Sequence, residues 1–240
     1  MNIPEWQSRT KLLIGEENLK KLACSHILIA GAGGVGGYVA EQLCRSGIGQ
    51  ITLVDNDTVQ PSNRNRQIIA LSSTENIRKT LLFEKRLKDI NPDVQLNIIT
   101  EFLSDENINP ILENHFDYIV DAIDTLTPKV NLLEKAYNKG FKIVSAMGSG
   151  GKINPLKIEI SDISKSHHCK FAYIVRKYLH RKNIFKGIKV VYSPESIPKS
   201  AIEVTNGENN KRSVVGTISY MPAIVGCYCA YVVIDDIIAK

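Results

Sequence analysis

Cysteine is scarce in this sequence, and the few that are present are not paired. The 240 residues contain five: Cys24, Cys44, Cys169, Cys227 and Cys229. None forms a C-x-x-C pair. Cys227 and Cys229 are two residues apart, which in a helix would place them on different faces. A structural zinc site takes four suitably placed ligands, so we expect no zinc. We expect Cys24 and Cys44 to lie in the core or in helix packing, where free cysteine is common.

Long uninterrupted apolar runs are also missing. The start of the chain, MNIPEWQSRTK, lacks the apolar core of a signal peptide. Residues 220–239 are mostly apolar, but Pro222 interrupts their start and Asp235 and Asp236 interrupt their end. We therefore interpret the part from Ala223 onward as a buried or dimer-facing helix and not as a membrane span. Together with the few unpaired cysteines, this predicts a cytoplasmic protein without stable membrane association.

A glycine-rich turn follows the first strong strand signal. Residues 27–30 (ILIA) are a short apolar run, typical of a strand buried on both faces. The next glycines, three of which fit the G-x-G-x-x-G pattern, are Gly31, Gly33, Gly34 and Gly36. Such a pattern permits a tight turn, close approach of a phosphate, and close packing of the next helix. A second strand at 51–54 and Asp55 after it complete a nucleotide-binding order; a turn kept only for packing is the alternative.

The loop after the second strand favours ATP over a nicotinamide cofactor. Its acids, amides and arginines are Asp55, Asp57, Asn63, Arg64, Asn65 and Arg66. Ligands of open α/β sheets bind beyond the carboxyl ends of the strands. One acid suffices to bind a ribose. Arginine and amide groups suit a triphosphate, because they stabilise the negative charge that develops on it. Lys79, in an amphipathic segment over residues 74–90, could add a point charge. A solvated lysine there is equally open, and Arg64 could be merely exposed.

A second acidic site follows another predicted strand. Residues 118–120 (YIV) precede Asp121 and Asp124, which again fall at a carboxyl end. A carboxylate there could hold Mg²⁺ that bridges ATP phosphates, since hard cations take oxygen ligands. The alternative is that one aspartate caps the next helix. Thr127 before Pro128 looks like the better cap, which leaves Asp124 for a ligand.

These motifs resemble the ThiF-like adenylating superfamily, which includes ubiquitin-activating enzymes and enzymes that adenylate sulfur-carrier proteins. The resemblance rests, in order and spacing, on GAGGVGG, LVDND, NRNRQ (Asn63 to Gln67), Lys79, NPDV and DAID. Residues 45–55, 63–71 and 148–169 are most similar to its branch of tRNA threonylcarbamoyladenosine dehydratases. The sulfur-carrier branch commonly has two C-x-x-C pairs, which this chain lacks. The resemblance covers nearly the whole chain.

The resemblance implies an ATP-dependent activation of a carboxylate. The threonyl carboxylate of threonylcarbamoyladenosine, next to the tRNA anticodon, would be adenylated and then cyclised with net loss of water. By position, the residues implied to bind nucleotide are the glycine turn (Gly31, Gly33, Gly34 and Gly36), Asp55, Asp57, Asn63, Arg66, Lys79 and Asp124. Arg66, Lys79, Asp124 and Arg9 would be catalytic, with Mg²⁺ on Asp124. Arg9 would reach the site of a partner subunit, so a homodimer is implied.

Three other interpretations remain. The main alternative is an adenylyltransferase that activates the C-terminal carboxylate of a ubiquitin-like sulfur carrier. A non-catalytic nucleotide-binding or sulfur-relay protein is less favoured, because Arg66, Lys79 and Asp124 are all present. A nicotinamide dehydrogenase is the most distant. A sulfur-transfer protein is a possible further partner, which would dock near Cys169.

The chain carries a net charge of +5, concentrated in one segment. Its cations between residues 165 and 189 are Lys165, Lys170, Arg176, Lys177, Arg181, Lys182, Lys186 and Lys189. An apolar stripe from Phe171 to Leu179 predicts a helix there, with Arg176, Lys177 and the 181–182 pair facing away. Such a helix could contact the phosphates of tRNA or be a solvated face. Cys169 lies among these cations and could be a nucleophile or persulfide acceptor; an incidental exposed thiol is the favoured reading.

The order of elements predicts an α/β fold: a Rossmann-like, doubly wound, mostly parallel sheet. Strands are expected near 27–30, 51–54, 94–99, 117–121 and 141–145, and a helix from Pro128 to Gly140. We expect residues 1–22 to form an N-terminal helical arm, 23–151 a nucleotide-binding part, and 152–240 a C-terminal extension, all within one continuous adenylating domain. Within the extension, residues 156–160 and 189–192 are expected to be antiparallel strands. The polar residues 194–214 are expected to form a mobile loop near the substrate entrance.

Overall fold

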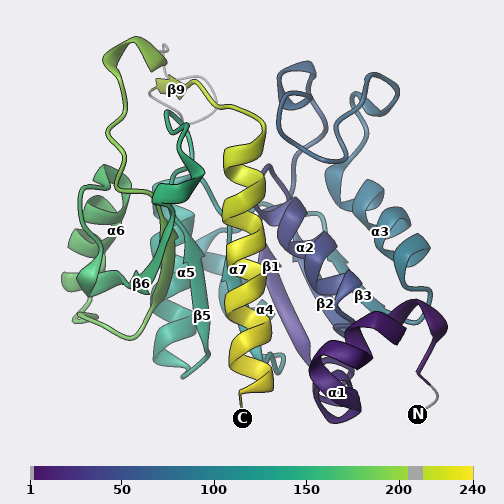
Figure 1. Ribbon diagram of the computed structural model, residues 1–240. Coiled ribbons are helices and arrows are strands. Elements are labelled where there is room, and N and C mark those ends of the chain that lie inside the picture. Colours follow the sequence, from purple (N-terminus) through teal and green to yellow (C-terminus); the bar gives the residue numbers. More distant parts are fainter. Residues whose placement is uncertain (1–2, 205–212, 240) are drawn as a thin grey trace.

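The computed structural model describes residues 3–204 and 213–239. Its main sheet has the order β3-β2-β1-β4-β5-β7-β6 within these residues (Figure 1). The parallel strands are β1 (His26–Ala30), β2 (Gln50–Val54), β3 (Gln95–Ile99), β4 (Tyr118–Asp121), β5 (Ile143–Ala146) and β7 (Lys189–Tyr192). At the edge, β6 (Glu159–Asp162) pairs antiparallel with β7. The predicted Rossmann-like, mostly parallel sheet with an antiparallel C-terminal strand is confirmed.

Helices cover both faces of the sheet (Figure 1). They are α1 (Ser8–Ala23), α2 (Gly36–Arg45), α3 (Lys79–Ile90), α4 (Asp105–Ile111), α5 (Leu126–Asn138), α6 (Lys170–His180) and α7 (Tyr220–Ile238). Strand side chains alternate between faces: Ile27 and Ile29 join the core under α2, α3 and α7, whereas Leu28 and Ala30 join the core under α4, α5 and α6. The expected burial of this strand on both faces is confirmed.

The C-terminal segment shares this sheet and this core. Strand β7 pairs with β5, and α7 packs against α2, α1 and β5. Of the described helices, α7 is long and apolar enough to cross a membrane, by length and composition only, with 44% of its apolar window buried. A core helix passes the same test. In Figure 1, α7 runs along the front of the sheet, and its buried residues, among them Val225, Cys229 and Val233, belong to the core.

Several predicted boundaries were wrong. The amphipathic segment over 74–90 is helical only from Lys79, because residues 72–74 form a separate 3-10 turn and Asn76 has a left-handed φ of 64°. Helix α5 starts at Leu126 after Thr125, so Pro128 is its third residue and Thr127 is not its cap. Residues 155–157 form a 3-10 helix, and β6 starts only at Glu159.

The N-terminal arm and the 194–214 segment complete the fold. Helix α1 contains a break at Gly15, whose φ of 81° and ψ of 164° are not helical. The predicted loop contains a 3-10 helix over Lys199–Ala201 and the strands β8 (Ile202–Val204) and β9 (Ser213–Val215), which pair antiparallel. Residues 205–212, in the middle of that predicted loop, lie outside the described residues.

Candidate functional site

The glycine turn lies where the strand order reverses. Strand β1 has β2 on one side and β4 on the other, and the turn follows β1 directly. Gly31 has a φ of +95°, and a Cβ there would lie 2.9 Å from the carbonyl oxygen of Ala122. A Cβ on Gly36 would lie 1.8 Å from the carbonyl oxygen of Gly31. These two glycines are therefore required for the turn itself, at the place where open α/β sheets bind ligands.

The two inner glycines face other surroundings. A Cβ on Gly33 would meet only the amide nitrogen of Gln67, at 3.8 Å, so there is room above it. A Cβ on Gly34 would lie 3.3 Å from Arg66 Cγ and 3.3 Å from Pro222 Cβ. The turn is thus overlaid by the 63–67 loop and by the start of α7. An Asn65 amide that donates to the Thr217 carbonyl at 2.9 Å joins the same two segments.

Asp55 and Lys79 form a buried charged pair beside the turn. One Asp55 oxygen accepts from the Ala32 N–H at 2.7 Å, and the other accepts from the Asp57 N–H at 2.8 Å. The Lys79 ammonium lies 2.7 Å from Asp57 Oδ2 and 3.9 Å from Asp55 Oδ1. Lys79 is only 4% exposed, so the alternative of a solvated lysine is wrong. Burial raises the pKa of the Asp55 carboxyl, and the nearby Lys79 ammonium opposes that effect.

The basic and amide side chains of the polar loop point in different directions. Arg66 Nη1 donates to the Ser62 carbonyl at 2.9 Å and to Asn65 Oδ1 at 2.8 Å, which fixes its guanidinium on its own loop, and its Cγ lies against Gly34. The Asn63 side-chain oxygen accepts from the Gln60 N–H at 3.1 Å. Arg64 pairs with Glu75 at 3.3 Å and is largely exposed. The structure therefore places Arg66 against the glycine turn, ties the Asn63 side chain to the backbone of its own loop, and leaves Arg64 on the surface.

The last residue of β4, Asp121, and Asp124 after the strand differ completely. Asp121 is fully buried, and the Lys129 ammonium and the Ser145 hydroxyl both donate to its Oδ2 at 2.5 Å. Asp124 is exposed at the carboxyl edge. Sequence reasoning did not identify Lys129 or Ser145. The available signal was that Lys129 stands four residues before Leu133 and seven before Ala136, and so falls on the buried stripe of α5.

Arg9 lies apart from the other predicted residues. It is exposed on α1, and its neighbour Gln7 donates from Nε2 to the carbonyl of Arg45, at the end of α2, at 3.5 Å. In Figure 1, α1 lies at the opposite edge of the sheet from the glycine turn. Arg9 does not reach the site of its own chain.

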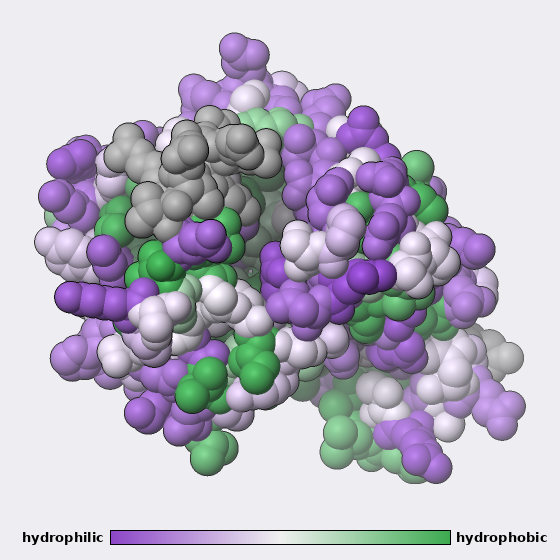
Figure 2. All heavy atoms as spheres, turned by 90° about the horizontal axis from the view of Figure 1, so that it is seen from above, coloured by the Kyte–Doolittle hydropathy of each residue, from purple (hydrophilic) through white to green (hydrophobic). Residues whose placement is uncertain are grey.

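Figure 2, which looks onto the carboxyl edge, shows a hollow whose side over the 55–78 loops is mainly hydrophilic.

Two predictions about cysteines were wrong, and Arg176 of α6 makes contacts that the sequence did not indicate. Cys169 is only 6% exposed, because it packs in the core with Met147 and Ala172, and is therefore not an exposed thiol. Cys24 is exposed, whereas Cys44 is buried as expected. The Arg176 guanidinium is tied to the preceding loop: its Nη1 donates to the Ser166 carbonyl at 2.6 Å and to the Ser166 hydroxyl at 2.7 Å. These acceptor oxygens hold the Arg176 guanidinium against residues 163–166.

A sequence model of the ThiF family matches residues 7–239 of this chain. The chain belongs to the ThiF family. Among ThiF-type proteins, it is 39% identical to the tRNA threonylcarbamoyladenosine dehydratase of Bacillus subtilis over 189 residues, 79% of this chain and 74% of that protein. It is 33% identical to the dehydratase of Haemophilus influenzae over 236 residues, 93% of this chain and 90% of that protein.

The ThiF fold of this chain also superposes on a solved structure. The match is the crystal structure of the E. coli tRNA N6-threonylcarbamoyladenosine dehydratase in complex with ATP, with a TM-score of 0.89 and 29% identity. It covers 100% of this chain and 98% of that one. The resemblance predicted from the motifs is confirmed at the level of family and fold.

Proposed function

We propose that the protein is an ATP-dependent tRNA threonylcarbamoyladenosine dehydratase. The observation that carries this proposal is the convergence of the glycine turn, Arg66 and the buried Asp55–Lys79 pair at the strand-order reversal. The support from outside the chain is the 33–39% identity to dehydratases over most of its length and the fold match to an ATP complex. At an adenylating site with these residues, a substrate carboxylate attacks the α-phosphate of ATP and is activated as an acyl-adenylate.

Each group of the site has a role in that reaction. The open space above Gly33 lets the phosphates approach the backbone, where the N-terminus of α2 favours negative charge. Asp55 and Asp57 hold the ribose, since an ionised carboxylate has about four acceptor positions and the backbone uses only some of them. Asn63, Arg66 and Lys79 bind the phosphates and stabilise the charge that moves onto pyrophosphate.

Mg²⁺ fits this site as a companion of ATP. Protein sites for Mg²⁺ commonly supply one or two carboxylates and leave the other positions to water and phosphates. The exposed Asp124 carboxylate at the carboxyl edge meets that requirement. When bound, Mg²⁺ neutralises phosphate charge, and Asp124 is the side chain that would hold it.

The chemistry needs no nucleophile from the protein. The threonyl carboxylate oxygen attacks the α-phosphate, pyrophosphate leaves, and an acyl-adenylate forms. The ureido group of the same substrate then attacks the activated carbonyl, loses its proton, and expels AMP. The sum is cyclisation with loss of one water at the cost of ATP. The buried position of Cys169 agrees with a route that uses no thiol.

The assembly around the site follows from the same proposal. Arg9 is on α1, at the opposite edge of the sheet from the glycine turn of its own chain. It can therefore contact a nucleotide only in another subunit, and we propose a homodimer. The exposed Leu12 and Leu13 on α1, 87% and 85% accessible, are apolar surface that a second subunit would cover. Of the cations of the 165–189 segment, the exposed Lys170 and Lys177 would contact tRNA phosphates, whereas Lys182 and Lys189 are paired with Glu134 and Asp236. We place the protein in the cytoplasm, and a sulfur-transfer partner remains a prediction.

One incubation tests the reaction. The purified chain is mixed with ATP, Mg²⁺ and tRNA that carries threonylcarbamoyladenosine, the tRNA is digested, and nucleosides are analysed by mass spectrometry. ATP-dependent loss of one water from that nucleoside, with AMP formed in step, is the expected result. Pyrophosphate exchange that appears only when a ubiquitin-like carrier with a free C-terminus is added would move the assignment to the sulfur-carrier reaction.

A further inference from the structure

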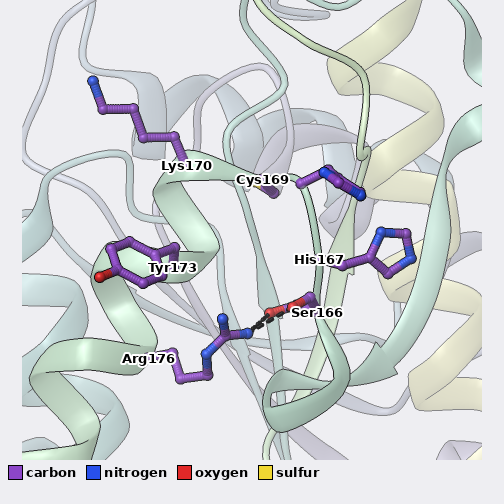
Figure 3. A pocket seen from close by; sticks show the side chains of 7 residues that line it. Ser166, His167, Cys169, Lys170, Tyr173 and Arg176 are labelled. Carbon is purple, nitrogen blue, oxygen red and sulfur yellow. Dashed lines mark hydrogen bonds between the residues drawn. The ribbon is translucent and has the colours of Figure 1, made fainter.

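A small pocket lies at the first turn of α6, apart from the glycine turn. It has a volume of about 210 Å³ and is lined by residues 166–170 with Tyr173 and Arg176 (Figure 3). Pockets for drug-sized ligands measure about 300–1,000 Å³. This pocket is therefore too small for ATP, but its size suits a single ring system or a single phosphate.

One wall of the pocket is an exposed aromatic ring beside a fixed guanidinium. Tyr173 is 57% exposed, and Arg176 Cζ lies 6.0 Å from its ring centre. Arg176 Nη1 is held by the Ser166 oxygens and by the Ile163 carbonyl at 3.1 Å, which leaves the other guanidinium nitrogens for a ligand. Figure 3 shows Tyr173 and Arg176 on the helix side of the pocket, with Ser166 and His167 opposite. An aromatic face with an adjacent cation is the pattern that stacks unpaired nucleic-acid bases.

The charges around the pocket fit a nucleotide and not an apolar ligand. Lys170 lines the pocket and Lys177 stands seven residues further on, so both project from the outer face of α6, and both are exposed. Facing Tyr173 across the pocket, the 166–169 loop carries His167 and His168; the imidazole of His167 lies 3.1 Å from Glu159. Phosphates that flank a stacked base would meet the lysines at the rim.

The pocket is on the catalytic side of the molecule. A Cβ on Gly148, just after the carboxyl end of β5, would lie 3.8 Å from Phe171 in the first turn of α6. The start of α6 thus adjoins the same edge of the sheet that holds the glycine turn. The modified adenosine of the proposed substrate lies next to the anticodon, in a single-stranded loop with unpaired neighbours.

We propose that this pocket binds one unpaired base of the tRNA anticodon loop, next to the modified adenosine, stacked on Tyr173. Arg176 covers the base edge or its phosphate, and Lys170 and Lys177 bind the flanking phosphates. The inference rests on the proposed dehydratase function and adds a base-binding site to it. In this site, stacking depends on the ring of Tyr173, whereas the phosphate contacts depend on charge and salt.

Equilibrium binding of an anticodon stem-loop RNA to the full chain tests this site. Tyr173→Ala is expected to weaken binding by about 5- to 100-fold, the usual cost of removing one aromatic stacking partner. Tyr173→Phe keeps the ring and is expected to bind like the unmodified chain. Tyr178→Ala is the matched control, since Tyr178 is also exposed on α6 beside an arginine, Arg181 at 5.1 Å, but does not line the pocket.

Salt dependence separates the two kinds of contact. Tyr173→Ala should leave the slope of log Kd against log salt unchanged, whereas Lys177→Ala should reduce it by about 0.7 for one lost phosphate contact. Turnover of the isolated threonylcarbamoyladenosine nucleoside should be unaffected by Tyr173→Ala, because that substrate has no flanking base. Binding of the stem-loop by Tyr173→Ala as tight as by Tyr178→Ala would overturn the base site alone. Failure of the unmodified chain to bind the stem-loop would overturn the site and the tRNA function together.

Discussion

The Lys129 ammonium and the Asp121 carboxylate form an ion pair of 2.5 Å in which both side chains are fully buried. Lys129 also donates to the Ala146 carbonyl at 3.0 Å and to the Ser145 hydroxyl at 3.2 Å. The other Asp121 oxygen accepts from the Ile123 N–H at 3.1 Å. One buried network therefore connects the ends of β4 and β5 with α5, and it shapes the turn that presents Asp124.

Removing one member of this pair should destabilise the fold strongly. Lys129→Met leaves the Asp121 carboxylate buried without its counter-ion, which costs about 3–5 kcal/mol of unfolding free energy in comparable pairs. Urea denaturation followed by circular dichroism measures the difference. The double variant Lys129→Met with Asp121→Leu removes both charges and should recover most of the loss. Equal stability of Lys129→Met and the unmodified chain would show that the pair contributes nothing.

The general fold could be predicted from local patterns, but this network could not. Strand positions followed from apolar runs and glycine turns, because a strand buried on both faces has a composition that few other elements share. Which lysine meets which aspartate depends on the packing of α5 against β4 and β5, and that is not local information. The same reason explains Cys169: its sequence neighbours are polar and basic, but its side chain points into the core.

Gly33 provides a test of the nucleotide site that leaves the fold intact. A methyl group there has room, whereas one on Gly36 would overlap the Gly31 carbonyl at 1.8 Å. Gly33→Ala should therefore unfold like the unmodified chain and bind ATP more weakly, because the methyl group occupies the space of a phosphate. Isothermal titration calorimetry with ATP measures the affinity. Gly36→Ala is the contrasting variant and should lose stability. Unchanged ATP affinity in Gly33→Ala would place the phosphates elsewhere.

Glu41 gives the fold a defined dependence on pH. It is 4% exposed, with Arg86 Nε at 2.6 Å and Arg45 Nη2 at 2.7 Å. Burial alone would raise the pKa of the Glu41 carboxyl, but the hydrogen bonds from Arg86 and Arg45 outweigh burial and lower the pKa below its usual value. The stabilisation is therefore fully present above the ordinary glutamate pKa of about 4.3, and it is lost as the pH falls through the lower folded-state pKa.

Arg86→Met should reveal this contribution. At pH 7 we expect a loss of about 1.5 kcal/mol, the lower end for a hydrogen bond to a charged group, since the Arg86 side chain is 39% exposed. The difference from the unmodified chain should shrink as the pH falls from the ordinary glutamate pKa toward the lower folded-state pKa of Glu41. Arg45→Met is the control: its side chain is 53% exposed and paired at i,i+4, so a loss of only about 0.5 kcal/mol is expected. A difference in unfolding free energy that stays constant from about pH 7 to about pH 3, a range that includes the ordinary glutamate pKa, would exclude Glu41 as the cause.

The site residues show where prediction from the sequence succeeds and where it stops. Positions after strand ends were predictable, because carboxyl ends of parallel strands share one edge. The state of each side chain was not: Lys79 is buried against Asp55 and Asp57, and Arg176 is turned toward Ser166. These states depend on contacts between segments that are distant in the sequence. Roles for such residues therefore have to be tested one at a time.

Asp124 is the residue whose role separates Mg²⁺-assisted adenylation from simple nucleotide binding. Asp124→Ala should fold normally, since the side chain is exposed, and should reduce ATP-dependent dehydration by at least about 100-fold, the usual cost of losing a group that stabilises transferred charge. Higher Mg²⁺ should restore part of the rate if the carboxylate only recruits the ion. Asp93→Ala is the matched control, because Asp93 is an exposed aspartate that precedes β3 at the opposite edge of the sheet. Full activity of Asp124→Ala at limiting Mg²⁺ would mean that another group holds the metal, and the assignment of Asp124 would then be wrong.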